Sequence, residues 1–170
     1  EATRYLLRGG GKAALVTGQI SQSGVLEQRT AGYRRAMEEA GYEVDEGLIY
    51  QGDITFEYGQ AAAAEIMKRK DVTKILTTAD ILARGIVNQL QSGGKKIPEE
   101  YSVMGFDNTY QSRNMSPRLT TVGQNISDRG EMAGKLILKI INHEEVAKEN
   151  YTDFQIIEGD TTLKNCIGYK

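Results

Sequence analysis

Charged and polar residues that follow apolar runs suggest a site for a small polar ligand. Asp107 ends the apolar run "YSVMGFD" (101–107), and a long polar loop comes after it. A carboxylate just past a buried strand is costly to desolvate unless hydrogen-bond donors face it. Ligand hydroxyl groups or a nearby arginine could supply those donors, and Arg29 is the candidate arginine.

The elements that must position these residues alternate along the chain. Short β-branched runs are separated by longer segments of helical periodicity, which is typical of βαβ units and a parallel sheet. The predicted strands are 12–18, 47–53, 73–80, 101–107 and 118–124, and residues 153–170 add one or two more. The predicted helices span about 26–40, a segment capped by Thr55, a segment capped by Asp80, and 127–142, for which Ser127 is the expected cap.

In open parallel sheets, the carboxyl ends of the strands line one crevice. The predicted strands therefore share a polar rim made of Thr17 to Gln22, Gly52, Asp53, Thr78 to Asp80, Asp107 and Asn108. Arg29, in the first turns of the first long helix, lies close to the same edge.

Each of these residues also has a purely structural interpretation. Asp53 and Asp80 fit helix caps or the residues before them, because loops that lead into helices commonly end on aspartate. Asp107 could form a turn with Asn108, although no helical pattern begins within several residues of it. Arg29 alone could be a solvated helix residue.

Composition limits the classes of protein that remain. Hydrophobic residues make up 39% of the 170, charged residues 26%, and the net charge is −2, which indicates a globular chain without a broad basic DNA-binding surface. The apolar runs are too short to span a membrane and the start lacks a secretion signal, so we expect a cytoplasmic chain without membrane contact. One cysteine and one histidine predict neither a disulfide nor a zinc site, and no cofactor is expected.

Four segments together resemble the effector-binding core of the lactose and galactose repressor (LacI/GalR) family of bacterial transcription regulators. They are "RTAGYRRAMEEAG" (29–41), "QGDITFEYGQAAAAEIM" (51–67), "TTADILARGIVNQLQSGGKKIPEEYSVMGFDN" (77–108) and "SPRLTTVGQNISDRGEMAGKLIL" (116–138). The resemblance implies an α/β fold like that of type I periplasmic binding proteins, with a parallel sheet flanked by helices. It also implies that a small effector alters DNA affinity.

The resemblance further implies that the effector contacts fall on Arg29, Asp107 and Gln124. A guanidinium donates paired hydrogen bonds, a carboxylate accepts them and an amide does both, which suits a sugar or a similar polyol. In the family, an aromatic residue often stands where this chain has Ile54, with Phe56 as a possible substitute. Ala79 replaces a common Asn or Asp. The site is therefore expected to survive while the effector differs.

The same resemblance implies that the chain is about the second half of such a repressor. Residues 1–123 would form the C-terminal effector-binding lobe, 124–152 a crossover strand and helix that belong to a truncated first lobe, and 153–170 the return strands. Operator DNA would be bound only through a missing N-terminal helix-turn-helix domain. The apolar stripe of the helix at 127–142 would then pack on a second copy of the chain, giving a homodimer, or fold back on its own sheet.

Two other classes of protein compete with a regulatory domain. A transport-type solute-binding protein shares the architecture, and an upstream helix-turn-helix or secretion signal would distinguish the two. An enzyme is disfavoured because "GGGK" (9–12) precedes a strand, no Gly-x-Ser-x-Gly motif occurs, and His143 lies near the polar end of a helix.

Overall fold

A six-stranded sheet forms the centre of the molecule in the computed structural model, which describes residues 1–163. The strand order is β2-β1-β3-β4-β5-β6, and all neighbours are parallel except β5 and β6. The strands are β1 (Lys12–Thr17), β2 (Ile49–Gln51), β3 (Val72–Thr77), β4 (Ser102–Phe106), β5 (Thr120–Gly123) and β6 (Gln155–Ile157). The order of the first five is that of doubly wound sheets, which confirms the predicted α/β class.

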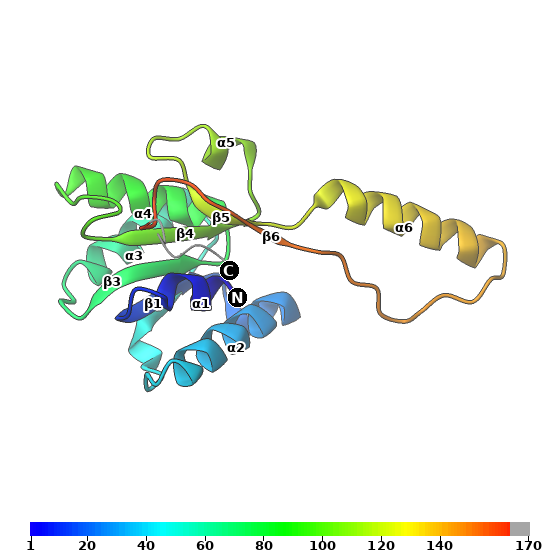
Figure 1. Cartoon of the computed structure of the whole chain (residues 1–170), viewed down its shortest axis with the longest axis horizontal. Coiled ribbons are helices and arrows are strands. Elements are labelled where there is room, and N and C mark those ends of the chain that lie inside the picture. The colour runs from blue at the N-terminus through cyan, green and yellow to red at the C-terminus, as the bar shows by residue number, and fades with distance from the viewer. Residues whose placement is uncertain (164–170) are drawn as a thin grey trace, which may run out of the picture.

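Helices cover both faces of this sheet. The helices of the chain are α1 (Ala2–Leu7), α2 (Gly24–Glu39), α3 (Phe56–Ile66), α4 (Asp80–Ser92), α5 (Tyr110–Arg113) and α6 (Ile126–Ile141), with short 3₁₀ turns at Ile20–Gln22 and Glu46–Leu48. All but α6 lie against the body of the molecule (Figure 1). Helices α1 and α2 pack on one face and α3 and α4 on the other. Figure 1 shows α1 and α2 below the sheet, α4 above it and α3 behind the strands.

The core divides into two clusters because successive side chains of a strand point to opposite faces. Within β1, Ala13 and Leu15 join the cluster beneath α1 and α2, whereas Ala14 and Val16 join the cluster beneath α3 and α4. All four side chains are at most 1% exposed. This double burial explains why the parallel strands are continuous apolar runs in the sequence.

Helices α3 and α4 approach each other closely at two glycines. A Cβ atom on Gly59 would lie 2.3 Å from the carbonyl oxygen of Leu82, and one on Gly85 would lie 2.0 Å from that of Phe56. Both distances are shorter than any van der Waals contact. Small residues at this crossing therefore set the spacing of the two helices.

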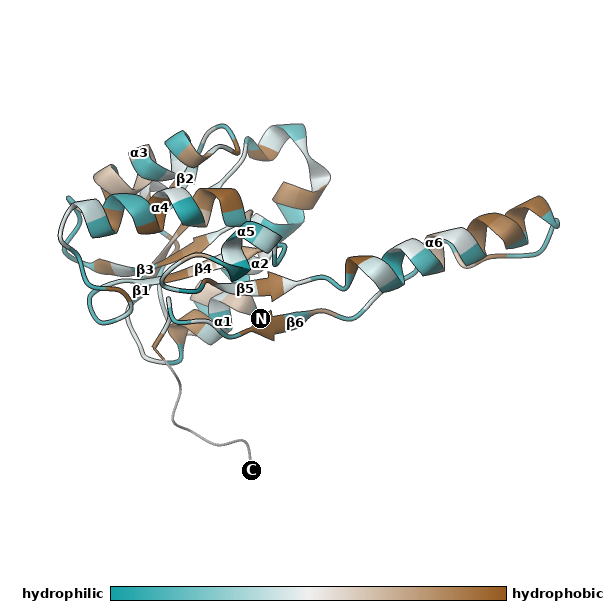
Figure 2. Cartoon of the chain, turned by 90° about the horizontal axis from the view of Figure 1, so that it is seen from above, coloured by the Kyte–Doolittle hydropathy of each residue, from teal (hydrophilic) through white to brown (hydrophobic). Residues whose placement is uncertain are grey.

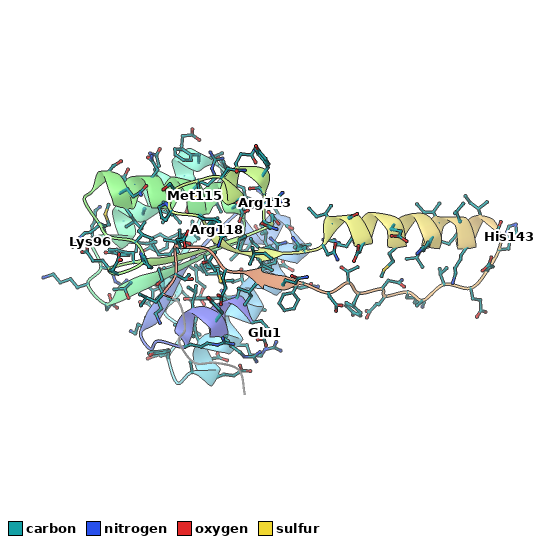
Figure 3. All side chains as sticks on the ribbon, turned by 45° about the horizontal axis from the view of Figure 1, so that its top comes forward. Glu1, Lys96, Arg113, Met115, Arg118 and His143 are labelled. Carbon is teal, nitrogen blue, oxygen red and sulfur yellow. The ribbon has the colours of Figure 1, made fainter. Side chains whose placement is uncertain are left out.

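Helix α6 extends away from the body, and residues 142–154 return alongside it to β6 (Figure 1). None of its residues is buried. Its exposed large apolar side chains are Ile126 at its start and Ile137, Leu138, Ile140 and Ile141 at its far end, which is brown in Figure 2. Figure 3 shows the side chains of α6 in open surroundings, with His143 at its tip. The expectation that this helix folds back on its own sheet is wrong.

Several local predictions need correction. Helix α1 was not foreseen, although Tyr5, Leu6 and Leu7 are buried in it. The N-cap residue of α6 is Asn125 rather than Ser127, in the left-handed conformation at φ 40°. The short helix α5 begins three residues after Asp107, where no helix was expected.

The cap at Thr55 is confirmed, since its side chain accepts a hydrogen bond from the Tyr58 N–H.

The described part of the chain ends shortly after β6. Of the strands expected over 153–170, β6 is seen and residues 164–170, with Cys166, lie outside the described part. Among residues 1–163, no helix has the length and apolarity that a bilayer crossing requires. In the same part of the chain, no three His, Cys, Asp or Glu side chains are grouped to hold a metal ion.

Candidate functional site

A cavity of about 570 Å³ lies at the carboxyl ends of the central strands. It is lined from α1, α2, the ends of β1, β3, β4 and β5, the first turns of α6 and the returning segment 150–154. The strand order reverses between β1 and β3, and in sheets of this type ligands bind at such a reversal. The volume falls within the range of small-molecule sites.

Asp107 stands at the end of β4 in an unusual backbone conformation. Its φ is 107° and that of Asn108 is 52°, both in the region that residues with a Cβ atom rarely adopt. Its N–H donates to the carbonyl of Val122. Burial raises the pKa of the Asp107 carboxyl above its usual value; the charge of Arg29 opposes this rise and that of Asp80 adds to it.

Arg29 reaches the same region from α2. Its Nη1 donates to the carbonyl oxygen of Thr78 at 2.7 Å, and its guanidinium carbon lies 3.7 Å from the centre of the Phe106 ring. Burial lowers the pKa of Arg29 below its usual value, against the opposing charge of Asp107. The side chain nevertheless stays charged at neutral pH, because arginine does not deprotonate in proteins.

Arg29 and Asp107 are thus both partly desolvated, and the charge of each acts on the other. Even so, they form no ion pair with each other within the described residues. Burial outweighs their mutual attraction, because the pKa of Arg29 is lowered and that of Asp107 is raised, and both changes favour the neutral group. A ligand that donates to the carboxylate and accepts from the guanidinium would supply the hydrogen bonds that neither group receives from the other.

Gln124 links this pair to α6. Its Nε2 donates to Asp107 Oδ1 at 2.9 Å, and its Oε1 accepts from Arg129 Nη1 at 2.8 Å. Sequence reasoning placed Arg29, Asp107 and Gln124 at one edge, and the structure brings them together there. It did not single out Arg129 or Phe106, although both line the cavity. The position of Arg129, five residues after Gln124 at the start of a helix, was the available signal.

Of the predicted contacts, Arg29 and Gln124 line this cavity, and Asp107 is joined to it through its hydrogen bond with Gln124. Ile54, Phe56 and Ala79 do not line it. Ile54 is 47% exposed and lies beside Gly18, at the end of β1. Phe56 is the partly buried first residue of α3, and Ala79 is buried in the core beneath α3 and α4. Their part in ligand binding stays a prediction.

Asp80 differs from its expected role as a helix cap. The N-cap residue of α4 is Ala79, and Asp80 is the first helical residue, 1% exposed. Its carboxylate instead accepts hydrogen bonds from Thr109, Ser112 and Thr121. Sequence spacing could not reveal these partners, which are 29 to 41 residues away.

A sheet of this order, with a cavity at its carboxyl edge, is consistent with the ligand-binding lobe of a periplasmic-binding-protein type. Residues 3–162 match the periplasmic binding protein-like domain. The chain belongs to that family. The proteins it is similar to include LacI-type transcription regulators, as the resemblance implied.

Similar proteins of known sequence or structure agree with this assignment. The HTH-type transcriptional repressor PurR of Vibrio atlanticus (strain LGP32) is 33% identical over 165 residues, which cover 96% of this chain and 49% of the repressor. The crystal structure of the transcription regulator CcpA of Lactococcus lactis has a TM-score of 0.87 at 28% identity, covering 94% of this chain and 59% of that one. A LacI family regulator from Enterococcus faecium with bound ribose has a TM-score of 0.82 at 26% identity, covering 95% and 60%.

The chain spans about half the length of the curated relatives it matches, since it covers 49%, 39%, 41% and 48% of the first four. These relatives are named as transcription regulators. The reading as a transport-type solute-binding protein is therefore not favoured.

Proposed function

We propose that this lobe binds a small, uncharged polyhydroxyl effector of the sugar class and belongs to a regulator whose DNA affinity the effector changes. Arg29 and Gln124, which line the cavity, carry this proposal together with Asp107, which accepts a hydrogen bond from Gln124. Vicinal hydroxyl groups can accept from the guanidinium and donate to the carboxylate. A regulator with bound ribose among the similar structures also supports a sugar. The lobe binds rather than converts its ligand, and operator contact is made through a helix-turn-helix domain.

The cation of Arg29 is the first target of a test. Arg29→Ala should weaken the binding of ribose, or of whichever sugar binds best, roughly 10- to 100-fold, because hydrogen bonds to charged groups contribute about 1.5–3 kcal/mol. The measurement is isothermal titration of the full chain, guided by a thermal-shift screen of monosaccharides, disaccharides and nucleobases. A bound sugar at free concentration c stabilises the folded chain by RT ln(1 + c/Kd), so the melting temperature rises as the sugar concentration exceeds Kd.

Arg34→Ala is the matched control. Arg34 lies on the same helix, but its guanidinium pairs with Glu46 at 2.8 Å on the surface. Its removal should leave the affinity unchanged. If no sugar in the screen shifts the melting temperature, the sugar class is wrong; if Arg29→Ala binds as tightly as Arg34→Ala, Arg29 is not a contact.

We also propose that the exposed apolar stripe of α6 is covered by a second copy of the chain, giving a homodimer. Five large apolar side chains on one helix with no buried residue support association. Residues 124–152 would then act as an exchange arm, while 1–123 and 153–170 form the effector-binding lobe. Light scattering of the chain should report a dimer that Ile137→Glu with Ile141→Glu converts to monomer. A wild-type monomer would remove this proposal.

A further inference from the structure

We infer that Asp80 is a positioning residue for the ligand site: its buried carboxylate holds the loop that carries Asp107. The effect of Asp80 on ligand binding rests on the proposed function, whereas the effect of Asp80 on the conformation of the loop does not. Asp80 does not line the cavity, and its oxygens already accept hydrogen bonds from three residues. It therefore acts through Asp107 rather than by touching a ligand.

The contacts of Asp80 join three segments at one carboxylate. Oδ2 accepts from the Thr109 N–H at 2.7 Å, from the Thr109 hydroxyl at 3.1 Å and from the Ser112 hydroxyl at 2.5 Å. Oδ1 accepts from the Thr121 hydroxyl at 2.6 Å. Asp80 thus connects the start of α4 with the loop after β4 and with strand β5. The same hydrogen bonds compensate the cost of burying its charge.

The loop held in this way is conformationally demanding. Asp107 and Asn108 both have positive φ, a conformation that persists in residues with a Cβ atom only where the surroundings enforce it. The next residue, Thr109, is anchored to Asp80 by two hydrogen bonds. On the other side, the Asn108 N–H donates to the Thr121 hydroxyl at 3.3 Å, and this hydroxyl is itself bound to Asp80.

Gly105 provides independent support. A Cβ atom at this position would lie 2.3 Å from Asp80 Oδ1 and 2.6 Å from Leu119 Cδ2. The glycine of the "MGFD" run therefore leaves room for the Asp80 carboxylate against the backbone of β4. Strand β4, which directly precedes Asp107, therefore accommodates the Asp80 side chain only because residue 105 is glycine.

The test compares Asp80→Asn with Thr161→Val in the full chain. Thr161 is also fully buried, and its hydroxyl donates to Val103 and accepts from the Thr120 N–H, at the opposite ends of β4 and β5. Asp80→Asn should speed amide hydrogen exchange at Asn108 and Thr109 at least about 10-fold and weaken ribose binding about 10-fold. Thr161→Val should change neither, although it removes two buried hydrogen bonds.

Equal exchange at Asn108 and Thr109 in the Asp80→Asn variant and the wild type would overturn the inference. If Asp80→Asn does not fold, Thr121→Val, which removes one donor to Asp80, should speed exchange at Thr109, whose N–H is bonded to Asp80, to a smaller degree. Unchanged exchange at Thr109 in that variant would equally contradict the inference. A wild-type chain that binds no sugar would refute the proposed function alone, because the exchange rates do not depend on a ligand.

Discussion

Replacing Asp107 by asparagine should weaken sugar binding roughly 10- to 100-fold while making the folded chain more stable at neutral pH. The affinity falls because a charged acceptor of ligand hydroxyl groups becomes a neutral amide, and hydrogen bonds to charged groups contribute about 1.5–3 kcal/mol. The fold keeps its contact to Gln124, because the asparagine oxygen can still accept from Nε2. Calorimetric titration of ribose checks the first part, with Asp53→Asn, an exposed carboxylate after β2, as the control that should retain affinity.

The gain in stability follows from the sign of the pKa shift. Burial raises the folded-state pKa of Asp107, so folding favours the protonated carboxyl. The contribution of Asp107 to stability is then fully present below the unfolded pKa of about 3.9 and is lost as the pH rises through the folded value. The advantage of Asp107→Asn should therefore grow from pH 4 to pH 7 in urea denaturation. An advantage that is constant with pH, or that shrinks as pH rises, would show that burial does not dominate at this carboxyl.

Gly85→Ala should be the most destabilising small substitution at the contact of α3 and α4. The added Cβ would meet the carbonyl oxygen of Phe56 at 2.0 Å and the backbone nitrogen of Gln60 at 3.0 Å. Backbone atoms cannot turn away as a side chain can, so the helices must separate. We expect a loss of about 3 kcal/mol, at the upper end of overpacking costs, and a melting temperature lower by about 6–12 °C.

Gly32→Ala is the matched control in another helix. Gly32 lies in α2 with nothing within 4 Å of the position that a Cβ would take. Alanine should stabilise this helix by about 0.5–1 kcal/mol, because glycine loses more backbone freedom on folding. Similar melting temperatures for the two variants would contradict the close packing of α3 against α4.

The parallel sheet and the strand-end pairing could be predicted because both follow from local patterns. The apolar runs of β1, β3 and β4 fix strands buried on both faces, and parallel strands bring their carboxyl ends to one edge. This shared edge places Asp107 near Arg29, which lies in the helix after the first strand, although the two residues are 78 positions apart in the sequence. The cap at Thr55 was equally local.

The remainder depends on contacts that no periodicity encodes. Asp80 has the position of a helix cap in the sequence, yet its partners belong to a loop and a strand far along the chain. The positive φ angles of Asp107 and Asn108 likewise have no signal in the local sequence pattern. For α6, the amphipathic pattern predicts a helix but carries no information on what covers its apolar side. For that reason the sequence left two alternatives for this helix, and one of them, the fold-back onto the sheet, was wrong.

The most direct test of the central claim is a crystal structure of the chain with the sugar that gives the largest thermal shift. We predict its hydroxyl groups within hydrogen-bond distance of the Arg29 guanidinium and the Asp107 carboxylate, in the cavity at the carboxyl ends of the strands. A sugar bound elsewhere on the molecule, with neither side chain in contact, would contradict it.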